Sequence, residues 1–271
     1  FFKNRTNRGL PYSLNRGIKM SQGIYLVRMD QDDISFQKRI ETQVHFMNTN
    51  PDVAISGTAV LTTVGKHKEV HKRLSNYEEI KGTLLFHNVL AHSSVIIRKK
   101  AITREKLLYD STAKNAEDYE FWIRCCWKLK MTNLATPLIF YRRHLNQMVS
   151  RPDIEAIKTI FRNRMLKRFV DNPTNKEINL HSQIANGVAM INWDEIQATE
   201  AWLWKIFQSN KKKRLVKKQA MLSVLEEQWF NVCARSSKLG IGIFREYLAS
   251  PIVGQAKKRW NHIFILMVKA L

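Results

Sequence analysis

The chain has 271 residues, of which 44% are hydrophobic and 25% are charged, and this composition excludes a disordered protein. Its formal net charge of +22 favours polyanionic partners, namely nucleic acid, an anionic membrane face or phosphorylated substrates, without choosing among them. No apolar run reaches the roughly 18 residues that a membrane span requires.

Residues 1–150 are predicted to alternate between strands and helices. Strands are expected at residues 24–29, 53–61, 93–98 and 133–142, the second of them broken by Gly57. Helices are expected at residues 36–47, 76–86 and 116–129, and residues 62–68 are expected to form a polar loop. This alternation predicts an α/β layered domain.

After residue 150 only helical periodicity is found, at residues 154–169, 193–207, 212–234 and 243–248. We therefore predict two domains, an α/β domain over residues 1–150 and an all-helical extension over residues 151–271. Trp202, Trp204 and Phe207 are interpreted as core residues of the extension.

The last segment combines basic and apolar residues. Lys257, Lys258 and Arg259 precede Trp260, and six apolar residues follow at positions 263–268. This pattern is typical of a helix that lies at a membrane interface, and equally of a terminal helix docked on its own domain.

Three carboxylates close the first expected strand. Asp30, Asp32 and Asp33 follow an apolar run that is predicted to be a buried strand, and ligands of open α/β sheets bind beyond the carboxyl ends of strands. Asp30 and Asp32 could hold a hard divalent cation such as Mg²⁺ or Mn²⁺. The alternative is an acidic turn in which Asp33 caps the next helix.

Two further segments carry chemistry. Glu117 and Asp118 fall in the opening turn of a helix, where acidic residues are also favourable for the helix dipole alone. Arg142 ends the last expected strand, and Arg143 and His144 lie just past it, where a histidine can ligate a metal.

Cysteine usage favours a reducing, cytosolic setting. Cys125, Cys126 and Cys233 form an odd set without the spacing of a disulfide framework or a zinc site, and the adjacent Cys125 and Cys126 are interpreted as small buried thiols.

Taken in order, these segments resemble the family 2 glycosyltransferases. The matching residues over the first 150 positions are Asn7-Arg8-Gly9, Asn15-Arg16-Gly17, Asp30-Gln31-Asp32-Asp33, Arg39, Gln43, Gly57-Thr58, His92-Ser93-Ser94, Glu117-Asp118-Tyr119 and Tyr141-Arg142 with His144. Each motif is weak alone, and their order and spacing carry the resemblance.

The resemblance implies a GT-A fold, a mixed sheet flanked by helices, and an inverting, metal-dependent transfer of sugar from a nucleotide-diphosphate donor to a hydroxyl acceptor. Asp32, with Asp30 and His144, would bind Mn²⁺ or Mg²⁺. Asp118 would be the general base, with Glu117 as the alternative base or a sugar contact.

The resemblance also implies that Asn7, Gly9, Asn15, Asp30 and Arg142 contact the nucleotide sugar. The expected role is synthesis of a surface polysaccharide or a glycolipid of the cell envelope, at a cytoplasmic location with peripheral contact to the anionic inner membrane face. The family normally begins with strands that are not found here, so we expect the chain to be a fragment that lacks the first strands of the sheet and is inactive alone.

Two other functions remain open from the residues. A sugar-phosphate nucleotidyltransferase would also use carboxylate-bound metal, but it would have no evident use for Glu117, Asp118 or the Tyr141–His144 segment. A basic nucleic-acid-binding module would account for the charge, but it would need aromatic residues interleaved with basic ones on one face or a recognisable helix-turn-helix, and the sequence has neither.

Overall fold

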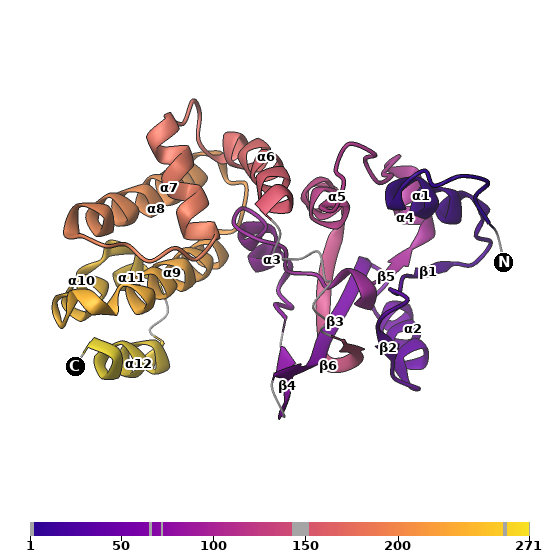
Figure 1. Cartoon of the computed structure of the whole chain (residues 1–271), viewed down its shortest axis with the longest axis horizontal. Coiled ribbons are helices and arrows are strands. Elements are labelled where there is room, and N and C mark those ends of the chain that lie inside the picture. The colour runs from indigo at the N-terminus through magenta and orange to yellow at the C-terminus, as the bar shows by residue number, and fades with distance from the viewer. Residues whose placement is uncertain (1–2, 65–66, 72, 143–151, 257–258, 271) are drawn as a thin grey trace. The chain divides into compact units, whose positions relative to one another are not determined.

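The computed structural model describes residues 3–64, 67–71, 73–142, 152–256 and 259–270 (Figure 1). The chain divides into two compact units. The first comprises Phe1–Leu84 and Asn88–Phe161, and the second comprises Leu85–His87 and Arg162–Leu271. The first unit holds the sheet, and the second unit is built from helices.

A mixed, six-stranded sheet forms the centre of the first unit. Its strands are β1 (Tyr25–Val27), β2 (Ile34–Ser35), β3 (Val53–Val64), β4 (His67–His71), β5 (Ile96–Arg98) and β6 (Lys130–Tyr141). The order is β1-β5-β3-β6-β2, with β4 paired to β3. β3 and β6 run parallel and the other pairs are antiparallel.

Short helices accompany this sheet (Figure 1): α1 (Leu10–Met20), α2 (Arg39–Thr49), α3 (Tyr77–Thr83), η1 (His92–Ser94), α4 (Lys99–Arg104), α5 (Glu117–Cys125) and the first part of α6 (Pro152–Phe169). Asn76, the first residue of the helix expected at residues 76–86, caps α3, because its side chain accepts hydrogen bonds from the amides of Glu78 and Glu79. The predicted mixed sheet flanked by helices is confirmed.

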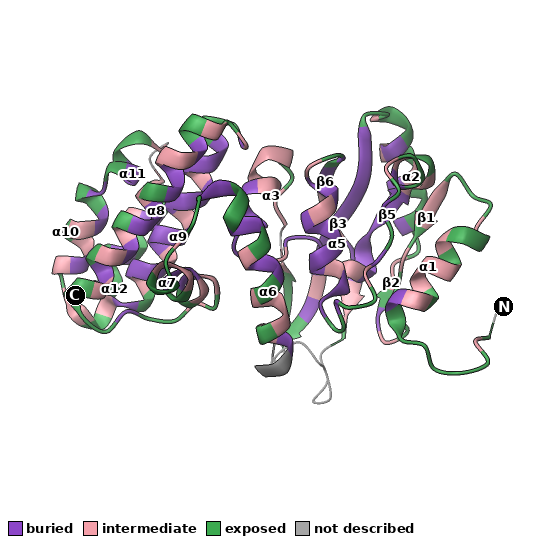
Figure 2. Ribbon diagram, turned by 90° about the horizontal axis from the view of Figure 1, so that it is seen from above, coloured by how far each residue is buried: buried purple, intermediate pink, exposed green. Residues whose placement is uncertain are grey.

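The core of the first unit lies along β3 and β5, most of whose residues are buried (Figure 2). Met47 of α2 packs there against Val53 and Ile96. Tyr119, Phe121 and Trp122 of α5 are also buried, which explains why a helix with three acidic residues in its first turn is held in place. Helix α5 and the strands of the sheet are therefore held by a packed hydrophobic core.

Two predictions about strands are wrong in detail. The first strand is not buried, since Ile24 is 74% exposed and β1 is the outermost strand of the described sheet, paired only with β5. Residues 62–68 do not form a loop. β3 continues to Val64 and pairs with β4, because the consecutive β-branched residues Thr62, Thr63 and Val64 favour extended backbone.

Gly57 does not break β3 either. A Cβ at this position would lie 2.2 Å from Oδ1 of Asn133 on β6 and 3.3 Å from Oγ of Ser94. Glycine therefore allows these two buried polar side chains to approach the strand, which runs on past it.

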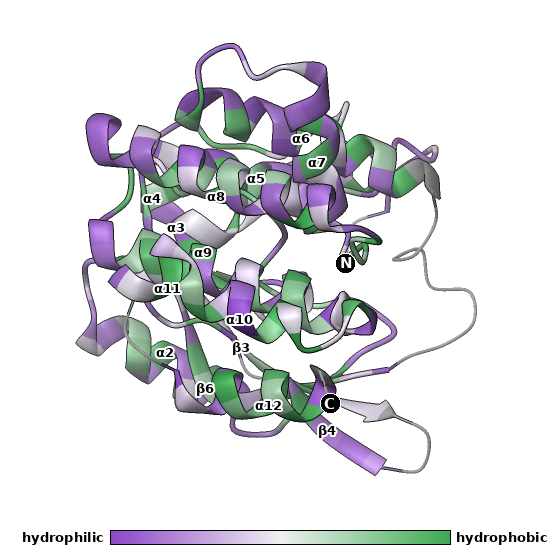
Figure 3. Cartoon of the chain, turned by 90° about the vertical axis from the view of Figure 1, so that its left-hand side faces the viewer, coloured by the Kyte–Doolittle hydropathy of each residue, from purple (hydrophilic) through white to green (hydrophobic). Residues whose placement is uncertain are grey.

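The second unit is helical throughout its described residues, which confirms the predicted all-helical character after residue 150. It contains the rest of α6, then α7 (Asn175–Ala185), α8 (Trp193–Lys213), α9 (Lys218–Arg235), η3 (Ser237–Leu239), α10 (Gly242–Ala249), α11 (Pro251–Gln255) and α12 (Trp260–Ala270). Figure 3 shows hydrophobic and hydrophilic residues alternating along these helices.

Local signals account for the helix ends of this unit. Thr174 and Glu177 form a capping box at α7. The buried Asn210 closes the turn after α8 by bonding both the amide and the carbonyl of Val216. Trp202 and Phe207 are buried, as predicted, and Trp204 is half-buried.

The three cysteines are buried and free of disulfide bonds, as predicted. Within the described residues, none of the helices combines the length and apolar composition needed to cross a bilayer.

Candidate functional site

The three aspartates after β1 form one cluster. A tight turn, in which the amide of Asp33 donates to the carbonyl of Asp30 at 3.4 Å, places one side-chain oxygen each of Asp30, Asp32 and Asp33 within 4.8 Å of one another. The sequence predicted proximity for Asp30 and Asp32, and the fold adds Asp33.

The prediction that Asp33 caps the next helix is wrong. Strand β2 follows Asp33, and α2 begins only at Arg39, with Lys38 at its N-cap and no side-chain cap. Because β2 pairs with β6, Asp33 instead meets the end of β6, where its Oδ1 accepts a hydrogen bond from the backbone amide of Arg142 at 3.2 Å.

The other oxygen of Asp33 is not hydrogen bonded. Its residue is only 6% exposed, and its Oδ2 is buried without a partner. Burial, together with the charges of Asp32 and Asp30, raises the pKa of Asp33. An unsatisfied carboxylate oxygen beside two further carboxylates fits the donor set of a hard divalent cation, which would satisfy the buried oxygen.

Arg28 pairs with this cluster, and the sequence prediction did not include it. Its guanidinium donates to Oδ2 of Asp30, which also accepts from Oγ of Ser93 at 2.7 Å. Although burial opposes ionisation, the hydrogen bond and charge of Arg28 hold the pKa of Asp30 below its ordinary value. The sequence could have indicated this ion pair, because Arg28 and Asp30 are two positions apart and residues i and i+2 of an extended segment point to the same side.

Glu117 and Asp118 begin α5 as predicted. Glu117 is buried and Asp118 is half-buried. Oδ1 of Asp118 accepts from the amide of Tyr119 at 2.6 Å, and Oδ2 accepts from Nδ2 of Asn88 at 2.7 Å. Burial raises the pKa of both carboxyls, and for Glu117 the neighbouring Asp118 adds to this. Asn88 follows α3 in the chain and had no sequence signal.

Arg28 relates the two acidic motifs. Its positive charge favours the ionised forms of Asp30, Glu117 and Asp118, although burial leaves the pKa of the last two raised. Contacts also join the motifs, because Ser93 donates to Asp30 and the ring of the adjacent His92 lies 6.0 Å from that of Trp122 on α5. The fold thus brings together the aspartate cluster and the start of α5, which are about 90 positions apart in the chain. In the sequence, only the family resemblance indicated that these two motifs form one site.

His92 lies in the same neighbourhood. Its Nε2 is 2.9 Å from the hydroxyl of Tyr109, and burial, with the charge of Arg28, lowers the pKa of His92 to about 3. This histidine is therefore neutral at physiological pH.

The expected donor loop has a defined backbone. Asn7 accepts from the amide of Gly9 at 3.0 Å, and Gly9 stands at the N-cap of α1 with φ of 79°, a conformation that favours glycine. The side-chain amide of Asn15 is bonded twice to the backbone of Tyr109, at 2.8 Å in each direction. Asn15 thus anchors α1, and donor binding by these residues stays a prediction.

The segment after β6 is described only as far as Arg142. The Nε of Arg142 donates to the backbone carbonyl of Asp32, so this arginine lies beside the aspartate cluster. Arg143 and His144 lie outside the described residues, and the metal-binding role of His144 stays a prediction.

Comparison with known proteins finds similarity in the amino-terminal part of the chain. Residues 1–111 match the model of glycosyl transferase family 2. An uncharacterized glycosyltransferase of Methanocaldococcus jannaschii is 32% identical over 128 residues, which cover 46% of this chain and 43% of that protein. The O-antigen biosynthesis glycosyltransferase WbnJ of Escherichia coli is 30% identical over 140 residues, covering 50% and 54%. The amino-terminal part of the chain is therefore similar in sequence to family 2 glycosyltransferases.

Among solved structures, the chain overlaps with residues 1–349 of S. aureus TarS in complex with UDP, with a TM-score of 0.47 and 12% identity over 87% of this chain and 72% of that one. The chain spans about half the length of the curated relatives it matches.

Proposed function

We propose that the protein is an inverting, metal-dependent glycosyltransferase that moves a sugar from a nucleotide-diphosphate donor to a hydroxyl acceptor in the synthesis of a surface polysaccharide or glycolipid. One observation carries this proposal: Ser93 donates to Asp30 of the aspartate cluster, and the ring of the adjacent His92 lies 6.0 Å from that of Trp122 on α5, the helix that begins with Glu117 and Asp118. Such a transfer needs one acidic group to hold the donor and another to activate the acceptor.

The donor side of the site is assigned to Asp30, Asp32 and Asp33. Their oxygens fit Mn²⁺ or Mg²⁺, and the buried, unpartnered Oδ2 of Asp33 supports the assignment. When bound, the cation supplies positive charge that stabilises the departing nucleoside diphosphate. Arg142, held at the cluster through the carbonyl of Asp32, is assigned to the same phosphate charge.

The acceptor side of the site is assigned to Asp118. Its carboxylate removes the proton from the acceptor hydroxyl while that oxygen bonds to the anomeric carbon, and the bond from this carbon to the diphosphate oxygen breaks with its electron pair. Attack opposite the leaving group inverts the carbon. The raised pKa of Asp118 supports this role, because a stronger base accepts the proton more readily.

Asn88 is assigned as the residue that positions this base. Its amide donates to Oδ2 of Asp118, while the amide of Tyr119 donates to Oδ1. Both oxygens of the carboxylate are thereby oriented before an acceptor arrives, which reduces the reorganisation needed for reaction. Glu117 is the alternative base or a contact to a sugar hydroxyl.

The proposal includes a cytoplasmic location with peripheral contact to an anionic membrane face. The basic surplus of the chain supports this part, since it would attract both anionic lipid and phosphorylated donor.

The test uses the complete protein with a panel of nucleotide sugars and Mn²⁺, and measures release of nucleoside diphosphate. Asp118→Asn and Asp32→Ala are each expected to lower turnover by about 10²-fold or more while the fold is retained. Proton NMR of the new linkage would establish whether the anomeric configuration is inverted.

Asp52→Ala is the matched control, because Asp52 is an exposed acid paired with Lys130 away from the cluster. It should leave turnover unchanged. Normal turnover by Asp118→Asn would remove the general-base assignment. Release of pyrophosphate from a nucleoside triphosphate and a sugar phosphate would instead identify a nucleotidyltransferase.

A further inference from the structure

Helix α12 (Trp260–Ala270) has two unlike faces. His262 and Leu266, one turn apart, are buried against the second unit, where α12 packs on α9, α10 and η3. On the other face Trp260 is 72% exposed, Phe264 is 63% exposed and Val268 is 56% exposed. Residues spaced by four positions lie above one another on a helix, so these three form one continuous apolar stripe.

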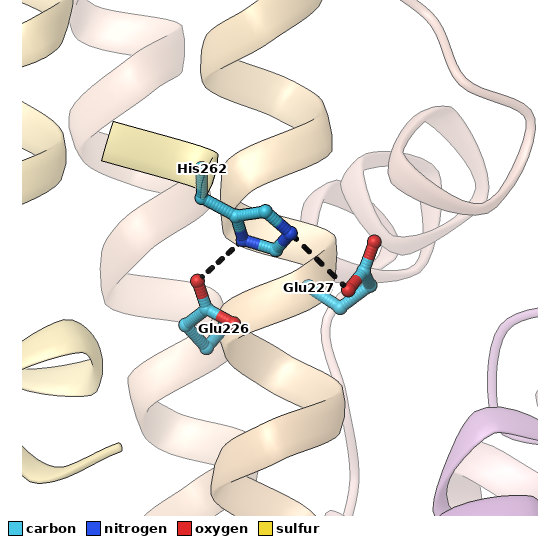
Figure 4. A group of neighbouring side chains, drawn as sticks. All are labelled: Glu226, Glu227 and His262. Carbon is cyan, nitrogen blue, oxygen red and sulfur yellow. Dashed lines mark hydrogen bonds and ion pairs between the residues drawn. The ribbon is translucent and has the colours of Figure 1, made fainter. Parts of the chain in front are cut away.

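The stripe is not the result of an undocked helix. His262 holds α12 to α9, with Nδ1 2.8 Å from Oε1 of Glu226 and Nε2 3.7 Å from Oε2 of Glu227 (Figure 4). Arg259 adds a contact from its Nε to Oε2 of Glu226 at 3.2 Å and a second ion pair with Glu227. The docked orientation of α12 therefore leaves the apolar stripe directed to solvent.

These contacts also explain why two glutamates and a histidine lie together at the start of α12. Glu226, Glu227 and His262 have the side chains of a metal site, but Glu226 is already bonded by His262, Arg259 and the hydroxyl of Tyr247. Neighbouring side chains of the protein thus neutralise and hydrogen bond the carboxylate of Glu226, and the cluster attaches α12 to α9.

Basic residues precede the stripe in the sequence. From Glu246 to the end of the chain the sequence has four basic residues, Lys257, Lys258, Arg259 and Lys269, and no further acidic one. Arg259 donates to Oγ of Ser223 at 2.6 Å, so α12 begins beside the first turns of α9. The exposed Lys217 and Lys218 open α9, about 7.5 Å along its axis from Ser223 at the usual rise per residue.

We propose that α12 lies at the surface of an anionic bilayer, with the stripe of Trp260, Phe264 and Val268 inserted at the headgroup level and Lys217 and Lys218 of α9 against lipid phosphates. This specifies the membrane contact of the proposed function. An aromatic residue at each of the first two stripe positions, together with flanking lysines, suits the interface rather than the bilayer centre. A second copy of the chain is a poorer occupant, because two surfaces of this positive charge repel each other.

The test is vesicle co-sedimentation of the complete protein at low salt, without any sugar donor, so its failure leaves the transferase proposal intact. Vesicles contain equimolar phosphatidylglycerol and phosphatidylcholine, with pure phosphatidylcholine for comparison. Binding to the anionic vesicles is expected, and Phe264→Asp should weaken it about tenfold or more. Brominated lipid should quench Trp260 fluorescence in the wild type and quench less in Trp260→Phe.

Ile191→Asp is the matched control, since Ile191 is an exposed apolar residue of the same unit outside α12. It should bind as the wild type does, and Phe264→Leu should also retain binding, with circular dichroism verifying the fold of each variant. The proposal is overturned if the wild type does not bind anionic vesicles, or if Ile191→Asp loses as much binding as Phe264→Asp. It is also overturned if sedimentation without lipid shows that Phe264 mediates self-association.

Discussion

Arg28 and Asp30 are joined by a hydrogen-bonded ion pair at the end of β1, and Oδ2 of Asp30 accepts from Ser93 as well. The arginine side chain is largely buried, and its backbone carbonyl accepts from NH2 of Arg39 at 2.8 Å. Its charge is therefore fixed in place beside the aspartate cluster.

Arg28→Ala is expected to weaken Mn²⁺ binding and to lower kcat/KM by about 10- to 100-fold, the range typical of residues that orient metal ligands. Arg28→Lys should recover part of the loss, because it restores the charge without the planar guanidinium. Isothermal titration with Mn²⁺ and initial-rate kinetics measure the two effects. Arg104→Ala removes an exposed pair with Glu105 and should change neither quantity. Unchanged values for Arg28→Ala would contradict a positioning role.

Asp33→Asn is expected to have opposite effects with and without a cation. The pKa of Asp33 is raised above its ordinary value of 3.8, so its contribution to stability is present at acidic pH and lost as pH rises through the raised pKa. At neutral pH without metal, Asn should therefore raise the melting temperature by a few degrees. With Mn²⁺ the variant should gain less stability than the wild type, as calorimetry would show. A lower melting temperature without metal would refute this account of Asp33.

Asn88 is expected to control the acidic limb of the activity profile. Its hydrogen bond favours the ionised form of Asp118, against the burial that raises the pKa of this carboxyl. Asn88→Ala should therefore raise the pKa of Asp118 further and move the acidic limb of kcat/KM to higher pH by about one unit. Asn88→Asp should move it further, because a second carboxylate opposes ionisation. An unmoved limb in both variants would exclude Asp118 as the titrating base.

Gly57→Ala is expected to destabilise the first unit by about 1–3 kcal/mol, because the new Cβ would clash with the buried side chain of Asn133. Nδ2 of Asn133 is bonded to the carbonyl of Leu74 at 2.7 Å, which resists its displacement. Gly17→Ala is the matched control in the middle of α1, where a Cβ meets no atom within 4 Å, and it should stabilise by about 0.4–1 kcal/mol. Urea midpoints of the two variants should shift in opposite directions.

Local signals predicted much of the fold. Asn76 defined the start of α3, the acidic residues Glu117 and Asp118 marked the start of α5, and helical periodicity identified the region after residue 150. Each of these depends on residues within a few positions of one another. The strand ends were predicted less well, because the extent of β3 depends on its pairing with β4 and β6.

The site was predicted in its residue types and only partly in its arrangement. Asp30, Asp32, Glu117 and Asp118 were selected from their positions at element ends. Arg28 and Asn88 were missed, because the role of a buried arginine or a loop asparagine depends on which carboxylates it contacts in the folded chain.

The sequence by itself determined which carboxylates end a strand and begin a helix, because such positions follow from local periodicity and capping. Only the tertiary structure decided what those carboxylates contact. It paired β2 with β6 and so turned Asp33 from a helix cap into a buried member of the cluster, and it placed Asn88 against Asp118. The physical reason is that a side chain's pKa and partners depend on charges and burial contributed by segments far away in the chain.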